Sequence, residues 1–301
     1  MGRSCVDAFA ESAAVFEAAD RALGFDLSTL CWDGPEEDLQ LTVNTQPAIL
    51  TVSIAVHRAL EAQGLEPRVV AGHSLGEYSA LVAAGSLAFE DAIRLVRTRG
   101  QLMQEAVPVG VGAMAAIIGL PSAELQAIVE AVGSQDSVCA VANLNAPGQT
   151  VIAGHRQAVE EAADAAKAAG AKRALILPVS APFHSPLMRP AREAMESHLR
   201  DAEIRDPRIP VVTNADAAPA TTARQVRDAL LRQIDQPVRW VESVTAMLSG
   251  FGIDRFVEVG PGRVLSGLIR RIAKDVDIEG VETWSLSEPD GVAKFLEECS
   301  V

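Results

Sequence analysis

The segment from Val69 to Glu77 constrains the fold of this 301-residue chain more than any other. It reads VVAGHSLGE, a short apolar run followed by Gly-x-Ser-x-Gly, and it leads into a helical pattern that ends at Gly85. A strand before this motif and a helix after it are the context in which it forms a nucleophile elbow. The segment therefore predicts an α/β sheet with Ser74 exposed at the carboxyl end of a strand. The alternative is a tight turn whose serine has no chemical role.

Elements on both sides of this segment extend the α/β pattern. We expect helices over residues 4–24, 45–62, 89–107, 186–200, 222–234, 240–250 and 263–274, and strands over 209–213 and 255–259. The middle of the chain differs, with predicted strands over 112–120 and 172–180, a hairpin over 138–154, and helices over 121–133 and 156–169. That βαββαβ order is typical of a ferredoxin-like unit. We predict a doubly wound, hydrolase-like parallel sheet core over residues 1–109 and 181–301, with a ferredoxin-like subdomain inserted over 110–180.

Charge and cysteine usage exclude several classes of protein. The chain has 26 Lys and Arg against 40 Asp and Glu, a formal net charge of −14. Nonspecific nucleic-acid binding depends on neutralising phosphates, so this balance argues against it. The four cysteines form no Cys-x-x-Cys pair, which argues against a zinc ribbon and indicates reduced thiols in the cytoplasm. No apolar run approaches the ~20 residues of a membrane span, so we do not expect membrane insertion. We also expect no metal site.

Two further residues are candidates for the chemistry. His184 lies in SAPFHSP, a loop between a strand and a helix, which suits a general base. On spacing alone, a structural histidine is an equally good interpretation. Arg99 lies in RTRGQLMQ, where three arginines on one helix, Arg94 included, ordinarily form a solvated face. An arginine fork is also the best receptor for a substrate carboxylate.

Six motifs together resemble the malonyl-CoA:acyl-carrier-protein transacylase family of fatty-acid synthesis. They are GHSLGEYSAL, RTRGQLMQEAVPVGVGAMAAIIGL, NLNAPGQTVIAG, SAPFHSPLM, QPVRW and VEVGPGRVLSGL. The resemblance extends over nearly the whole chain, in the same order. It implies a two-step transfer of malonyl from coenzyme A to the phosphopantetheine thiol of acyl carrier protein. It also implies the inserted ferredoxin-like subdomain.

The resemblance implies a role for each matching residue. Ser74 attacks the malonyl thioester and becomes an ester, and His184 takes the serine proton and returns it to the leaving thiol. The backbone carbonyl of Gln233 orients His184, Arg99 pairs with the free malonyl carboxylate, and the N–H of Leu75 contributes to the oxyanion hole. Five further residues are expected to line the substrate pocket: Gln46, Met103, Asn143, Asn145 and Phe183. The bulky Phe183 resembles the residue typical of malonyl-selective rather than methylmalonyl-accepting members.

The start of the chain departs from the family pattern. The family begins with an apolar strand within the parallel sheet and a GQGSQ loop, whereas Met1-Gly2-Arg3 aligns with a later stretch. In the family the loop supplies a second oxyanion-hole amide, whose loss typically costs about 10²–10³ in rate. We interpret Met1 as an internal methionine miscalled as the start. A truly short chain, and hence a non-catalytic relic that binds carrier protein, is the alternative.

Partners and competing functions follow from the same resemblance. We expect malonyl-CoA and acyl carrier protein as partners, a monomer, and no cofactor, since coenzyme A and phosphopantetheine enter as parts of the substrates. A stand-alone polyketide-synthase acyltransferase would use the same residues. A serine thioesterase or esterase would instead need an acidic triad member and would release the acyl group to water. An acidic carrier protein would need a local basic patch, for which Arg270, Arg271 and Lys274, or Lys172 and Arg173, are candidates. Ordinary surface charges are an equally good interpretation of both clusters.

Overall fold

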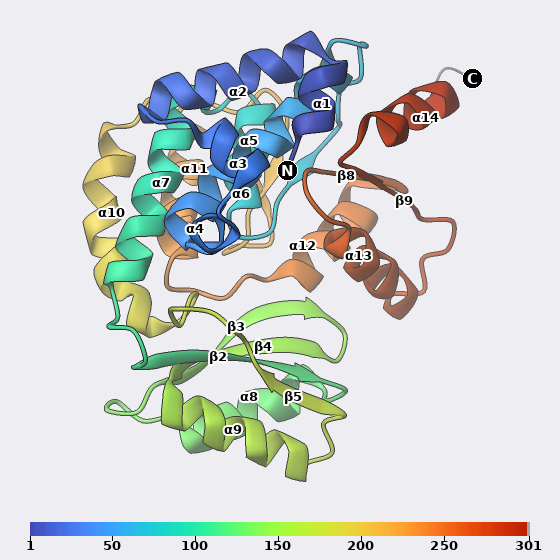
Figure 1. The fold of residues 1–301 in the computed structure, drawn as a ribbon. Coiled ribbons are helices and arrows are strands. Elements are labelled where there is room, and N and C mark those ends of the chain that lie inside the picture. Colours follow the sequence, from blue (N-terminus) through green and yellow to red (C-terminus); the bar gives the residue numbers. More distant parts are fainter. Residues whose placement is uncertain (300–301) are drawn as a thin grey trace.

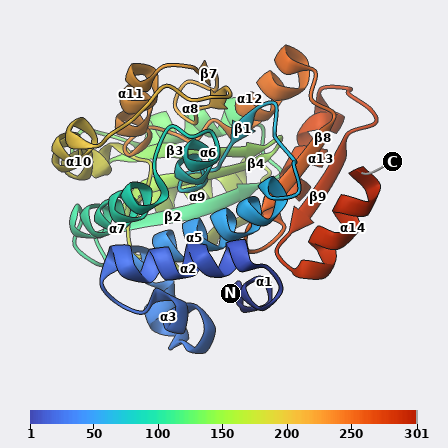
Figure 2. The same cartoon turned by 90° about the horizontal axis from the view of Figure 1, so that it is seen from above.

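The amino-terminal part of the chain is mainly helical and covers one face of the molecule (Figures 1 and 2). The computed structural model describes residues 1–299. The helices of this part are α1 (Arg3–Ala8), α2 (Ala10–Leu23), α3 (Leu27–Asp33), α4 (Glu36–Gln40) and α5 (Thr42–Glu61). The single helix predicted over 4–24 is in fact two, because Phe9 has an extended backbone that separates α1 from α2. Gly24 ends α2 as predicted, with a left-handed φ of 73°.

Helix α5 is the central helix of the larger domain. Its side chains are buried almost continuously from Gln46 to Leu60. A helix that is apolar on all sides belongs in the interior of a protein. It packs against α2 on one side and against α7 (Phe89–Glu105) on the other. The sequence places it there because residues 47–56 carry no charged side chain.

The parallel sheet of the larger domain is present as two separate parts. Strand β1 (Val70–Ala71) pairs in parallel with β6 (Val211–Val212), which also pairs with the antiparallel β7 (Pro219–Ala220). Strand β8 (Arg255–Val259) pairs in parallel with β9 (Glu282–Leu286). Within the described residues no ladder joins the two parts.

A cavity of about 510 Å³ separates the two parts of the sheet. Residues Val69 to Gly72 line one wall, and residues Asp254 to Val259 line the opposite wall. The parallel α/β core predicted from the sequence is therefore present, but it is divided between β1 and β8.

Helices flank both parts of the sheet (Figure 2). They are α6 (Gly76–Ala83), α10 (Arg189–Asp201), α11 (Ala223–Gln233), α12 (Trp240–Thr245), α13 (Val264–Asp275) and α14 (Pro289–Cys299). A 3₁₀ turn at Pro186–Met188 precedes α10, and a π-helical turn at Ala246–Gly250 follows α12. None of the helices in the described part of the chain combines the length and apolar character that a membrane span requires.

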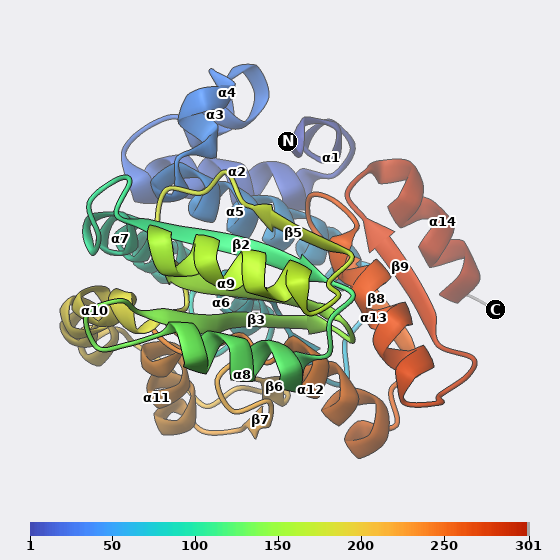
Figure 3. The same cartoon turned by 90° about the horizontal axis from the view of Figure 1, so that it is seen from below.

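The middle of the chain forms a separate antiparallel sheet with two helices on its outer face (Figure 3). Its elements are β2 (Gly112–Ile118), α8 (Ser122–Val132), β3 (Cys139–Ala146), β4 (Gln149–His155), α9 (Arg156–Ala168) and β5 (Arg173–Ile176). The strand order β3-β4-β2-β5 is that of a ferredoxin-like sheet. The opposite face of the sheet packs toward the larger domain, where Leu144 donates a backbone hydrogen bond to Val238. This part of the fold matches the predicted βαββαβ order.

Five elements were not predicted from the sequence: α3, α4, β7, β9 and α14. Each is short, and the helices among them bury few side chains. Strand β9 mixes polar and apolar residues and is held by its pairing with β8. Such segments depend on tertiary contacts more than on their own pattern.

Candidate active site

Ser74 lies in a sharp turn between β1 and α6, at the carboxyl end of β1. Its backbone has a positive φ of 51°, a conformation that residues other than glycine seldom adopt. The turn requires glycine at position 72, because a Cβ there would lie 1.9 Å from the backbone carbon of Gly76. The structure therefore has the strand–turn–helix geometry that the sequence predicted, with its serine in a strained conformation typical of functional sites.

His184 contacts the serine from a loop that is 110 residues further along the chain. Its Nε2 lies 2.8 Å from the Oγ of Ser74, and its Nδ1 lies 2.8 Å from the backbone oxygen of Gln233. A carbonyl oxygen only accepts, so Nδ1 must carry the hydrogen and Nε2 presents its lone pair to the serine hydroxyl. Burial, and next the positive charge of Arg99, lower the pKa of His184 to about 3. The imidazole is therefore neutral near pH 7 and able to accept a proton.

Arg99 is a buried cation that touches the nucleophile. Its guanidinium donates to the Oγ of Ser74 at 3.1 Å, to Gln46 at 2.6 Å and to the side chain of Gln233 at 2.9 Å. Arg99 is only 2% exposed, and it forms no ion pair within residues 1–299. Its Nε also has no hydrogen-bond partner in that part of the chain. Because a buried charge without a counter-charge is costly, this guanidinium is suited to receive a carboxylate from a ligand.

Two residues that the sequence analysis missed complete this network. Asn214 follows β6, and its side chain accepts from the N–H of Ser74 at 2.6 Å and donates to the carbonyl of Gly72 at 2.7 Å. Glu77 is 1% exposed and accepts from the backbone N–H of Asn214 and from the side chain of Gln233. Burial raises the pKa of Glu77 to about 7. Their positions, on the first turn after the elbow and just after a buried strand, are the signals that could have identified them.

The backbone N–H of Leu75 is free to bind an oxyanion. Within residues 1–299 it has no intramolecular acceptor, whereas the N–H of Ser74 is bonded to Asn214. Leu75 is also the N-cap of α6, where backbone amides and the helix dipole favour negative charge. The structure thus places this predicted donor beside Ser74 in a suitable state.

The other predicted pocket residues are distributed around this centre. Gln46 contacts Arg99 directly, and its own Nε2 donates to Thr42 at 2.9 Å. Met103 and Phe183 both contribute to the hydrophobic cluster that includes Leu75.

The two predicted asparagines of the inserted subdomain lie on β3. Asn145 faces the elbow, where its side chain lies 2.8 Å from Nε2 of His73. Asn143 is 6% exposed and pairs through its backbone with Val151 and Val238, with no side-chain hydrogen bond to the catalytic residues in the described structure. The roles predicted for these pocket residues stay predictions.

Metal ligands are not gathered at this site. No group of three or more His, Cys, Asp or Glu side chains suited to a metal ion occurs in the part of the chain that the structure describes.

Comparison with known proteins gives a consistent result. The acyl transferase domain family matches residues 1–297. The malonyl CoA-acyl carrier protein transacylase of Escherichia coli K12 is 49% identical over 283 residues, which cover 94% of this chain and 89% of that protein.

Solved structures agree in fold as well as in sequence. The malonyl CoA-acyl carrier protein transacylase of Coxiella burnetii superposes with a TM-score of 0.94 at 43% identity, covering 99% of this chain and 92% of that one. A malonyl-transacylase solved in complex with a type II polyketide synthase acyl-carrier protein gives 0.94 at 44% identity, covering 99% and 94%.

Proposed function

This chain belongs to the acyl transferase domain family, among the malonyl-CoA:acyl-carrier-protein transacylases, and we propose that it transfers malonyl from malonyl-CoA to the phosphopantetheine thiol of acyl carrier protein. The observation that carries the proposal is the buried Arg99, which lacks a carboxylate partner within residues 1–299 and lies 3.1 Å from the Oγ of Ser74. Malonyl carries a free carboxylate one methylene from its thioester carbonyl. A group of that shape can reach Arg99 and Ser74 together.

The first half of the reaction makes an ester on Ser74. The serine Oγ attacks the thioester carbonyl while its proton passes to Nε2 of His184, and the N–H of Leu75 faces the oxyanion that develops. The C–S bond then breaks, and His184 returns the proton to the coenzyme A thiolate. A thioester is already activated, so a base and an oxyanion donor supply the chemistry that the step needs.

The second half repeats these steps with another thiol. The phosphopantetheine thiol gives its proton to His184 and attacks the malonyl ester, and Ser74 leaves with the proton that His184 returns. We propose Gln233 as the group that orients His184 through its backbone carbonyl, with Gln46 beside Arg99. Met103 and Phe183 are proposed to line the substrate pocket, with Asn143 and Asn145 on the thioester side.

A serine hydrolase is the alternative from a different class. Its triad would place a carboxylate at Nδ1 of His184, whereas the backbone oxygen of Gln233 occupies that position here. A carbonyl stabilises an imidazolium less than a carboxylate does, which suits an activated thioester better than an ordinary ester. The contact therefore supports transfer over hydrolysis.

Labelled malonyl-CoA tests the proposed function. The chain should acquire a stable label that is absent from Ser74→Ala and is discharged by the phosphopantetheinylated carrier protein. Rapid loss of label to water without an acceptor would show a hydrolase instead. Fatty-acid and polyketide carrier proteins should be compared as acceptors, because a 44% identical relative was solved with a polyketide carrier protein.

The place of action and the division into domains complete the proposal. We infer a core of residues 1–109 and 181–301 carrying the catalytic residues, with residues 110–180 as the inserted unit. The four cysteines of the chain are free thiols, and we propose a cytoplasmic monomer that needs no cofactor. Sedimentation of the purified chain tests the monomer.

Two exposed basic clusters are the candidates for the docking surface of an acidic carrier protein. One is on α13, where Arg271 also bonds Gln149 of the inserted subdomain, and the other is at the start of β5. Reversing the charges of Arg270, Arg271 and Lys274, or of Lys172 and Arg173, should raise KM for carrier protein at low salt in one case. A cluster whose reversal leaves KM unchanged is excluded.

A further inference from the structure

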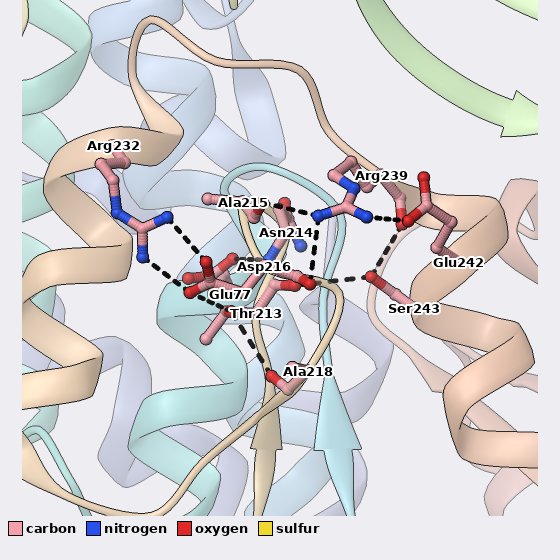
Figure 4. A network of polar contacts seen from close by, with 10 residues as sticks. All are labelled: Glu77, Thr213, Asn214, Ala215, Asp216, Ala218, Arg232, Arg239, Glu242 and Ser243. Atoms are coloured by element: carbon pink, nitrogen blue, oxygen red, sulfur yellow. Dashed lines mark hydrogen bonds and ion pairs between the residues drawn. The ribbon is translucent and has the colours of Figure 1, made fainter. Parts of the chain in front are cut away.

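The side chain of Glu77 joins two residues that separately contact the reacting groups. Glu77 lies in the first turn of α6, three residues after Ser74. Its Oε2 accepts from the backbone N–H of Asn214 at 2.7 Å and from Nε2 of Gln233 at 3.0 Å. Figure 4 shows Glu77 pointing from α6 toward the loop that carries Asn214. One oxygen atom of one buried side chain therefore fixes both residues.

The first of these residues holds the elbow in its strained shape. Through its side-chain amide, Asn214 bonds both the N–H of Ser74 and the carbonyl of Gly72, one on each side of His73. Ser74 keeps its positive φ of 51° within this bridge. Such a conformation is costly and persists only where surrounding contacts hold it.

The loop that carries Asn214 is itself anchored from two sides (Figure 4). Arg232 forms two hydrogen bonds of 2.7 Å with Asp216, and Arg239 donates to the backbone oxygens of Ala215 and Asp216. These contacts fix the loop but do not reach the elbow. Within residues 1–299, the hydrogen bond to Glu77 is the one that connects the backbone of Asn214 to α6.

The second residue, Gln233, faces the proton acceptor and the substrate-binding cation. Its Nε2 donates to Glu77 and to the carbonyl of Ser74, so its Oε1 must face Arg99, 2.9 Å away. Its backbone oxygen holds Nδ1 of His184. A rotated amide would present an NH₂ group to the guanidinium of Arg99, which has no acceptor to offer.

We propose that Glu77 is a positioning residue that fixes the geometry of Ser74, His184 and Arg99 together, through Asn214 and Gln233. Within residues 1–299 its side chain forms no hydrogen bond with Ser74 Oγ or with Arg99. The inference takes the reaction from the proposed function, but the positioning itself concerns the reactivity of Ser74 toward any electrophile.

A serine-directed fluorophosphonate probe measures that reactivity without malonyl. Ser74 Oγ forms a bond to phosphorus, fluoride leaves, and the serine proton goes to His184. We expect Glu77→Ala to lower the labelling rate about 100-fold, because displacing reactive groups by about 1 Å has that effect. Glu77→Gln keeps an acceptor oxygen and should stay within about 10-fold of the unaltered chain.

Glu258 offers a matched control of the same chemical kind. Its carboxylate accepts from the backbone N–H groups of Leu265 and Ser266 at the start of α13, and within residues 1–299 it forms no hydrogen bond with the elbow, Asn214 or Gln233. Glu258→Ala should lower the melting temperature and leave the labelling rate unchanged. An equal loss of labelling in Glu258→Ala would overturn the proposal, because the effect of Glu77→Ala would then be one of stability.

Two further measurements complete the test. The effects of Glu77→Ala and Gln233→Ala on the labelling rate should not add in the double variant, because both substitutions remove the same hydrogen bond between Glu77 and Gln233. If Glu77→Ala does not fold, Glu77→Asp replaces it, since the shorter side chain withdraws the carboxylate and should lower labelling at least about 10-fold. A folded variant that labels at the unaltered rate overturns the proposal. If the unaltered chain labels but does not transfer malonyl, the proposed function fails and the positioning role is still decided by the probe.

Discussion

The regions on the two edges of strand β1 differ in the hydrogen bonding of their buried polar side chains. On the edge paired with β6, the side chains of Glu77, Asn214 and Gln233 all form hydrogen bonds that converge on Ser74. On the other edge lies the cavity of about 510 Å³ between β1 and β8. Three atoms of residues that line it, Nε2 of His57, Oγ of Ser79 and Nε1 of Trp240, are buried without partners within residues 1–299.

This difference separates preorganisation from packing. The hydrogen bonds among Glu77, Asn214 and Gln233 hold reactive groups in place before the substrate arrives, which is what transition-state stabilisation requires. In this region Nε of Arg99 and the hydroxyl of Tyr78 are the buried polar atoms without partners within residues 1–299. A cavity with unpartnered polar atoms contributes little to reactivity and lowers stability. Changes in the first region should therefore alter rates, and changes in the second should alter the free energy of unfolding.

The largest expected effect is the difference between substitutions of two buried histidines, one in each region. His184→Ala removes the proton acceptor and should lower malonyl transfer by at least about 10³-fold. His57→Leu removes a buried, unpartnered nitrogen at the cavity, so transfer should stay within about two-fold and the melting temperature should not fall. Single-turnover transfer and thermal unfolding of both variants give the two readouts. Loss of transfer in His57→Leu would show that the regions are not independent.

The next largest effect concerns two arginines on α7. Arg99→Ala should lower kcat/KM for malonyl-CoA by about 10²–10³-fold while acetyl-CoA loses less, because only malonyl has a carboxylate to pair. Arg97 serves as the control: it lies over the ring of Phe25 at 4.5 Å and donates to Asn44. Arg97→Ala should leave the ratio of the two substrates unchanged. The same ratio in both variants would exclude Arg99 as the carboxylate receptor.

The sequence predicted the part of this comparison that depends on local geometry. The elbow follows from the strand, Gly-x-Ser-x-Gly and helix pattern, in which the structure requires glycine at position 72, and the inserted βαββαβ unit follows from alternating strand and helix patterns. The contact of Gln233 with His184 was expected from the family resemblance, and the structure has it at 2.8 Å. Residue by residue, the catalytic roles stay predictions until they are measured.

The long-range hydrogen bonds of Glu77 and Asn214 were not predicted from the sequence. Glu77 and Asn214 are 137 positions apart, and nothing in the local pattern around Asn214 shows that its side chain bonds the elbow. A buried acid on the first turn of a helix ordinarily reads as a favourable interaction with the helix dipole. The division of the parallel sheet between β1 and β8 was also not predicted, because the two-residue strand β1 is too short for its sequence to show which edge is paired.

A pH-dependent difference in stability distinguishes Glu77 from exposed acids. Its pKa is raised from 4.5 to about 7, chiefly by burial, although the N–H groups of Asn214 and Gln233 and the charge of Arg99 oppose this and Asp216 adds to it. The folded chain thus binds this proton more tightly than the unfolded chain. The stability from this group is full below pH 4.5 and is lost as the pH rises through about 7, a change of about 3 kcal/mol.

Glu77→Gln should remove that part of the pH dependence. The free energy of unfolding, measured in urea at about pH 5 and about pH 8, should fall less with rising pH than in the unaltered chain. Glu105→Gln, exposed on α7, should keep the original slope. Around Glu77, Asp216, Tyr78 and Arg232 keep the same charge in the folded chain at both pH values, because the pKa of Asp216 is lowered and those of Tyr78 and Arg232 are raised. The buried His184, whose pKa is lowered to about 3, takes up a proton in this range only on unfolding, and this contribution is the same in both proteins and cancels in the comparison. An unchanged slope in Glu77→Gln would contradict the burial argument.

The smallest expected effect tests the cavity itself. Ala83 lies at the carboxyl end of α6 and lines the space between β1 and β8, far along the helix from Ser74. Ala83→Leu adds apolar atoms to a space that already exists, and each buried methylene contributes about 0.8 kcal/mol. We expect a gain of about 1 kcal/mol in the free energy of unfolding, measured in urea, with unchanged malonyl transfer.

Ala92 on α7 provides the opposite case, because it is fully buried in close-packed surroundings. Ala92→Leu should destabilise the chain by about 1–3 kcal/mol, since extra methylenes in a filled core force neighbouring side chains out of their preferred rotamers. If both substitutions destabilise equally, the space beside β1 is not available to a side chain. If Ala83→Leu also slows transfer, then packing on the unpaired edge of β1 reaches Ser74, and the separation of rate from stability between the two edges fails.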